Sequence, residues 1–220
     1  MAHQVAVIGM GRFGTTLARE MYDIGHDVLI IDRDERLAQS MVGHVTYVVT
    51  GDATATELLE EVGIGNFDTA VVAIGTDVQS SILATVLLKK QFKLDHVIAR
   101  ATSEIHGTTL TAVGADRVVF PEQETGIRTA HSLFQRDVLE YMALTGDFGF
   151  SKVNVSPDME GKTLEQAGFS TGRDRYGVAV IAIKRGRDPI LNPAKDEVLQ
   201  VGDMLVVGSK EGALDQGQAK

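Results

Sequence analysis

The sequence contains no cysteine among its 220 residues. This absence excludes disulfide bonds, thiol catalysis and zinc sites built from cysteine. Basic residues are also few, since 21 lysines and arginines stand against 30 aspartates and glutamates, which gives a formal net charge of −9. Because nucleic-acid binding usually depends on a basic surface, we do not expect a nucleic-acid partner.

Long hydrophobic runs are absent as well. No apolar stretch approaches the roughly 18 residues that a membrane-spanning helix needs. The first residues lack the basic and apolar regions of a signal peptide, so we expect a soluble protein, which could still dock on a membrane protein. The lack of cysteine is compatible with a cytoplasmic location. The hydrophobic content of 44% in a chain of this length predicts one or two domains with buried cores.

A glycine-rich segment near the start is the most informative part of the chain. Residues 5–14 read as a buried strand, a tight turn and the start of a helix. Gly9, Gly11 and Gly14 follow the spacing G-x-G-x-x-G. In this pattern the first glycine permits the turn, the second lets the backbone approach a phosphate, and the third lets helix and strand pack closely. We therefore predict a nucleotide-binding turn here.

A second predicted strand ends at Asp32, 18 positions after Gly14. This is close to the spacing of about 20 residues at which a carboxylate binds the ribose of a bound nucleotide. The alternative is that Asp32 only caps the helix that starts near Glu35. We favour ribose binding because the strand end and the spacing agree.

Strands alternate with helices along the first part of the chain, and each strand is nearly all apolar. This pattern predicts an α/β fold with a Rossmann-like, doubly wound parallel sheet, which binds ligands at the carboxyl ends of its strands. A helix is expected over 126–144 as a crossover to the second part, which reads as a small α+β domain. We place the two domains at residues 1–144 and 145–215.

Charged residues gather at the predicted strand ends. Arg12 lies in the glycine turn and Arg100 ends the fifth strand, and two guanidinium groups suit a polyphosphate. Glu122 on the same edge would repel phosphates unless a cation lay between them, which predicts a metal-linked nucleotide. The alternative that Arg12 and Glu122 are exposed, or paired with each other, remains open.

No sequence motif supplies a reaction. The six histidines are scattered, and the HExxH, GxSxG and GxxxxGK[ST] patterns are missing. We therefore expect a protein that is not an enzyme. Two other hypotheses remain: a small NAD(H)-binding redox sensor or oxidoreductase, and a free-standing nucleotide-binding module.

Several segments carry a resemblance to a known family. An RCK domain of the TrkA-N type resembles several segments of the first part: residues 5–14, the strand end Asp32, residues 51–53, 71–75 and 114–119, and Pro121-Glu122 followed by Gly126. The companion TrkA-C domain resembles residues 160–164, Tyr176-Gly177 with residues 181–183, and residues 202–205. One copy of each is typical of the regulatory subunit of a Ktr-type potassium uptake system.

The resemblance implies a cytosolic gating subunit that lies at the inner face of the plasma membrane beneath a membrane potassium channel or transporter subunit. Such subunits form homodimers that assemble into homo-octameric rings, and they bind ATP or ADP, sometimes NAD(H). It further implies that Arg12 contacts phosphate, Asp32 the ribose, and Asp52 and Ala53 the adenine side. Glu122 would bind a divalent cation, such as magnesium or calcium, that bridges the γ-phosphates of a dimer pair. The complete set of predicted binding residues is Gly9, Gly11, Arg12, Phe13, Gly14, Asp32, Asp52, Ala53, Ile74, Gly75 and Arg100, with Glu122 as the metal ligand.

Overall fold

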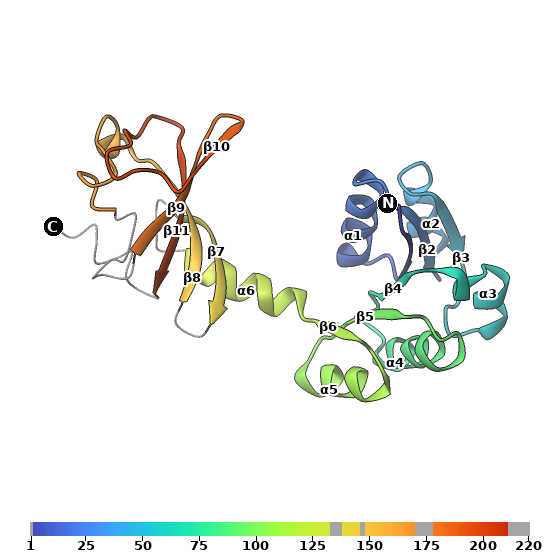
Figure 1. Cartoon of the computed structure of the whole chain (residues 1–220). Coiled ribbons are helices and arrows are strands. Elements are labelled where there is room, and N and C mark those ends of the chain that lie inside the picture. Colours follow the sequence, from blue (N-terminus) through green and yellow to red (C-terminus); the bar gives the residue numbers. More distant parts are fainter. Residues whose placement is uncertain (1, 133–137, 146–147, 170–177, 211–220) are drawn as a thin grey trace. The chain divides into compact units, whose positions relative to one another are not determined.

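The computed structural model describes residues 2–132, 138–145, 148–169 and 178–210 (Figure 1). Its contacts divide the chain into two compact units, Met1–Glu122 and Gln123–Lys220. The boundary between family domains expected at residue 144 stays a prediction. In the described part of the chain, no helix has both the length and the apolar character needed to cross a membrane.

The first unit is a Rossmann-like parallel sheet, which confirms the predicted fold class. Its strands follow the order β3-β2-β1-β4-β5-β6, and all neighbouring pairs are parallel. The strands are β1 (Gln4–Ile8), β2 (Asp27–Asp32), β3 (Tyr47–Thr50), β4 (Thr69–Val72), β5 (His96–Arg100) and β6 (Arg117–Val119). The carboxyl ends of all six strands therefore lie along one edge, where the predicted site residues were placed.

Helices cover both faces of this sheet (Figure 1). One face packs against α1 (Arg12–Asp23) and α2 (Glu35–Met41), and the other against α3 (Thr56–Glu61), α4 (Val78–Val86) and α5 (Glu104–Val113). A short 3-10 helix, η1 (Ile64–Asn66), follows α3, and a π-helical turn, η2 (Leu87–Gln91), extends α4.

Alternate side chains of the central strand belong to opposite cores. In β1, Val5 and Val7 pack with Ala18 of α1, whereas Ala6 and Ile8 join the core that covers the other face. Because strand side chains alternate between faces, a strand covered on both sides is apolar throughout. This explains why the sequence pattern predicted the sheet.

Polar caps fix where helices begin after the strands. Asp34 accepts hydrogen bonds from Arg36 N and Leu37 N at the start of α2, and Asp77 accepts one from Ser80 N at the start of α4. Such caps stabilise helix starts by satisfying free N–H groups. They also hold these residues at the carboxyl edge of the sheet.

The helix expected over 126–144 is only partly correct. Helix α6 runs over Pro121–Ser132, and a strand, β7, occupies Val138–Thr145. Strand β7 pairs antiparallel with β8 (Phe148–Asn154). The segment is apolar enough to suit either structure, and pairing with β8 decides in favour of the strand because it satisfies backbone hydrogen bonds along its length.

The second unit contains a five-stranded antiparallel sheet, which agrees with the small α+β domain expected from the sequence. Its order is β10-β9-β11-β8-β7. The remaining elements are η3 (Pro157–Met159), β9 (Val178–Arg185), β10 (Asp188–Leu191) and β11 (Met204–Lys210). Its core includes the fully buried Leu164, Ile183 and Leu205.

Candidate nucleotide-binding site

The glycine turn joins β1 to α1 and is tightly constrained. Gly9 adopts a φ of +100°, which favours glycine. A Cβ on Gly14 would lie 2.0 Å from the carbonyl oxygen of Gly9, so no other residue fits there. A Cβ on Gly11 would meet nothing within 4 Å. Backbone at Gly11 is therefore open to a ligand, while Gly9 and Gly14 hold the turn closed.

The start of α1 presents the first charged group of the site. Arg12 is exposed and makes no ion pair with any residue that the structure describes. Phe13 packs its side chain against the core beneath α1. Because Phe13 lies in the first turn of α1, its backbone N–H has no partner within the helix. The first N–H groups of a helix and a nearby guanidinium together favour an anion.

The carboxylate of Asp32 is tied to the same turn. One oxygen accepts a hydrogen bond from Met10 N in the glycine turn, and the other accepts one from Asp34 N at 2.9 Å. Asp34, not Asp32, caps helix α2. The alternative role of Asp32 as a helix cap is therefore wrong, and its ribose role stays a prediction.

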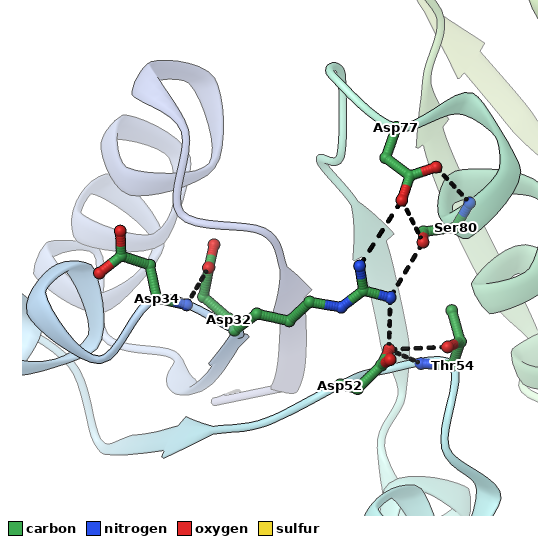
Figure 2. A network of polar contacts seen from close by, with 7 residues as sticks. Asp32, Asp34, Asp52, Thr54, Asp77 and Ser80 are labelled. Atoms are coloured by element: carbon green, nitrogen blue, oxygen red, sulfur yellow. Dashed lines mark hydrogen bonds and ion pairs between the residues drawn. The ribbon is translucent and has the colours of Figure 1, made fainter.

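A polar network centred on Arg33 lies next to Asp32, and no sequence motif predicted it. Arg33 Nη2 donates to Asp52 Oδ1 at 2.8 Å and to Ser80 Oγ at 3.0 Å, and Nη1 lies 3.5 Å from Asp77 Oδ2. Figure 2 shows Asp52, from the segment after β3, converging with Asp77 and Ser80 at the start of α4. The position of Arg33 directly after Asp32 was the one available signal for it.

Asp52 and Asp77 are held as charged groups by these contacts. Burial alone would raise the pKa of Asp52, but hydrogen bonds from Thr54 and Arg33 outweigh it and lower the pKa. The hydrogen bonds from Ser80 lower the pKa of Asp77. The hydrogen bond to Asp52 raises the pKa of Arg33. Ala53, which was also predicted to lie on the adenine side, is buried.

Arg100 and Glu122 form an ion pair at the opposite end of the edge. Their side chains approach to 2.6 Å, with Arg100 largely buried and Glu122 exposed. A Cβ on Gly75 would lie 2.1 Å from Arg100 Nη1, so glycine there lets the guanidinium lie over the end of β4. Neighbouring Ile74 packs against the core. Glu122 is thus paired, but with Arg100 rather than with Arg12.

The described residues contain no group of three or more histidine, cysteine, aspartate or glutamate side chains that could hold a metal ion by themselves. A cation at Glu122 would therefore need further oxygen ligands, such as phosphates. The role of Glu122 as a metal ligand stays a prediction.

These features define a class of protein: a Rossmann-like ligand-binding domain, with an open glycine turn and a strand-end carboxylate, followed by a small antiparallel domain. The TrkA-N domain model matches residues 5–121, and the TrkA-C domain model matches residues 151–216. The chain therefore belongs to the TrkA-N/TrkA-C family, as its sequence motifs predicted.

Relatives match over nearly the whole chain. It is 33% identical over 207 residues to the Ktr system potassium uptake protein C of Bacillus subtilis, covering 94% of this chain and 92% of that protein. It is also 33% identical over 204 residues to the Ktr system potassium uptake protein A of Vibrio alginolyticus, covering 93% and 91%. The crystal structure of the GsuK RCK domain is similar in fold, with a TM-score of 0.53, 24% identity, and coverage of 98% of this chain and 46% of that one.

Proposed function

We propose that this protein is a nucleotide-binding regulatory subunit of a membrane potassium transporter or channel. The observation that carries the proposal is the open backbone at Gly11 beside a carboxylate, Asp32, that is hydrogen-bonded into the same turn. Relatives that are named as potassium uptake proteins and match over nine-tenths of both chains supply the transport role. In this role the protein regulates transport and does not act as an enzyme.

The ligand that fits the site is an adenine nucleotide, ATP or ADP, with NAD(H) as a further candidate. Its phosphates would lie at the N-terminus of α1, close to Gly11 and Arg12. Its ribose would lie at Asp32, whose carboxylate accepts hydrogen bonds from hydroxyl groups and repels a 2′-phosphate. Asp52 and Ala53 would lie on the adenine side.

A divalent cation is part of this proposal. Glu122 is exposed and a carboxylate oxygen is a ligand that magnesium and calcium accept. Arg100, which pairs with Glu122 in the free protein, can donate hydrogen bonds to the last phosphate of ATP. ATP and its cation thus offer a phosphate to Arg100 and a metal ion to Glu122. ADP lacks that phosphate, and this difference gives the two nucleotides different affinities for two states of the protein.

Assembly into homodimers and a homo-octameric ring at the cytoplasmic face of the plasma membrane completes the proposal. Exposed apolar side chains on two helices of the first unit support it: Leu83 of α4 is 44% exposed and Ile105 of α5 is 82% exposed. Large apolar side chains left in water on neighbouring helices are typical of contact surfaces.

Titration calorimetry of the full chain with ATP, ADP and NADH, each with and without magnesium, tests the proposal. We expect ATP and ADP to bind, and magnesium to strengthen ATP binding. Glu122→Gln should weaken magnesium-dependent ATP binding by about tenfold and leave ADP binding nearly unchanged, because only ATP needs the cation at this carboxylate.

Two outcomes would contradict parts of the proposal. Equal losses for ATP and ADP in Glu122→Gln would remove the metal role of this residue. A clear preference for NADH with no ATP binding would favour the alternative of a small redox sensor or oxidoreductase.

A further inference from the structure

Arg33 is an exposed arginine held in one position by three acceptors. It donates to Asp52 and Ser80 and pairs with Asp77, while its side chain remains 53% exposed. Ser80 Oγ in turn donates to Asp77 Oδ2 at 2.6 Å, which closes the network (Figure 2). An exposed arginine normally samples many rotamers, so this network fixes a group that would otherwise be mobile.

The hydrogen bonds of a guanidinium lie in its plane, because all five N–H groups point outward within that plane. Acceptors at Asp52, Ser80 and Asp77 therefore engage the edge of the Arg33 guanidinium and leave its faces uncovered by these contacts. Together with the exposure of the side chain, this produces a flat, cationic surface at the carboxyl edge of the sheet.

A phosphate is not a suitable partner for this cation. An arginine after the strand-end carboxylate often binds the 2′-phosphate of a dinucleotide. Here Asp52 and Asp77 already give the guanidinium two negative charges, and Asp32 and Asp34 lie next to it in the chain. An added phosphate would face this excess of carboxylates, so a neutral ligand group fits better.

The position of Arg33 indicates which neutral group this is. Arg33 follows Asp32, the proposed ribose ligand. Its partners come from the loop after β3 and from the start of α4 rather than from the glycine turn. A nucleotide with phosphates at α1 and ribose at Asp32 extends its base away from the turn, toward these loops.

We propose that the guanidinium of Arg33, held flat by Asp52, Asp77 and Ser80, is a preformed stacking surface for the base of the bound nucleotide. This inference rests on the proposed function. Guanidinium groups stack on aromatic rings, and a group already fixed in the free protein loses little entropy on binding. Arg33 is then a binding residue, and Asp77 a positioning residue that acts through it.

Arg33→Leu tests the inference by titration of the full chain with AMP, ADP and ATP. Loss of the cation–ring contact should weaken all three nucleotides by the same factor, roughly 3-fold to 30-fold. The equal factor is the diagnostic result, because the three ligands share one base and differ only in phosphate number. Arg12→Gln provides the contrast, since its loss should increase from AMP to ATP.

Three further variants serve as controls. Arg36→Leu removes an exposed arginine of α2 with the same change in charge and should leave all affinities within about twofold. Arg33→Lys keeps the positive charge but lacks the planar guanidinium group. It should therefore restore less than half of the binding free energy that Arg33→Leu loses. Asp77→Asn can still accept the hydrogen bond from Ser80 N that caps α4, but weakens the hold on Arg33, so it should weaken the three nucleotides equally by about 2-fold to 5-fold.

The outcomes separate this inference from the proposed function. Failure of the wild-type chain to bind any adenine nucleotide would overturn both. Normal wild-type binding with no loss in Arg33→Leu would overturn the stacking role alone, and a loss that increases with phosphate number would make Arg33 a phosphate ligand instead. Circular dichroism of each variant confirms that the fold is retained.

Discussion

Gly11 is the N-cap of α1 and Gly14 lies in its first turn, but glycine has a different role at each position. Gly14 has the Gly9 carbonyl oxygen where a side chain would begin, so its role is steric and internal to the protein. Gly11 has open space there, so nothing in the protein itself requires glycine. A requirement for glycine at 11 would therefore come from a ligand.

Paired substitutions distinguish these roles. Gly14→Ala should destabilise the protein by about 3 kcal/mol, because a methyl group at 2.0 Å from a backbone oxygen forces strand and helix apart. Gly11→Ala should leave stability within about 0.5 kcal/mol and weaken nucleotide binding by about tenfold. Urea denaturation and calorimetry measure the two effects, and a stable, nucleotide-binding Gly14→Ala protein would contradict the packing argument.

At the scale of helices and strands, buried polar side chains hold single elements in place, and α5 is one example. Helix α5 begins at a cap, Ser103, and contains His106, whose side chain is buried although its Nε2 has no hydrogen-bond partner among the described residues. Thr102 N donates to the other ring nitrogen at 3.3 Å. His106 is therefore a buried histidine and not a surface one.

The pH dependence of stability should reveal His106. Burial lowers the pKa of its imidazole, so the unfolded chain takes up a proton at higher pH than the folded one. The contribution of His106 to the free energy of unfolding is complete above pH of about 6.5, the pKa in the unfolded chain. This contribution decreases as the pH falls from 6.5 through the lower pKa of the folded protein. His106→Gln should flatten the decrease in urea midpoint between pH 7.5 and 5.5; an unchanged slope would show that other groups cause it.

In the second unit, Arg185 joins β9 to the turn before β11. It donates from Nε and Nη2 to Asp203 at 3.0 and 2.8 Å, and from Nη1 to Glu197 at 2.9 Å. The side chain of Asp203 is only 1% exposed. Burial would raise the pKa of Asp203, but the hydrogen bonds from Arg185 and Gln200 N outweigh burial and lower it.

Asp203→Asn should destabilise the second unit by about 2–4 kcal/mol, since it leaves a partly buried guanidinium short of a charge partner. The ion pair between Lys195 and Glu165 is a control, because its atoms lie 3.5 Å apart and both side chains are 68% exposed. Lys195→Gln should therefore cost less than about 0.5 kcal/mol.

The pKa of Asp203 is lowered in the folded protein, so its contribution to the free energy of unfolding is present above pH of about 4 and lost in stronger acid. Urea denaturation measures these effects, and similar losses in both variants would contradict the role of burial.

At the scale of the whole molecule, regulation requires that a local ligand change the state of an assembly. Nucleotide binding shifts such an assembly only if its states differ in affinity. The exposed Leu83 and Ile105 mark a surface of the first unit that a second copy could cover.

The proposed ring predicts the mass in solution. Eight copies of the 23.7 kDa chain give about 190 kDa, which multi-angle light scattering after gel filtration measures directly. Replacing Ile105 by Asp should shift the mass to smaller species, because a charge would be buried at the contact. A monomer at micromolar concentration in the presence of ATP would instead support the free-standing module.

The sequence by itself determined the parallel sheet, the glycine turn and the family. These follow from local patterns, because a strand buried on both faces must be apolar and a tight turn against a helix must be glycine. The tertiary structure decided that β7 is a strand, that Asp34 and not Asp32 caps α2, and that Glu122 pairs with Arg100 rather than Arg12. It alone revealed the network of Arg33, since its partners Asp52 and Asp77 are distant in sequence. A long charged side chain can pair with residues that are distant in sequence, and the arrangement of the strand ends in the folded protein determines which acceptors lie close enough.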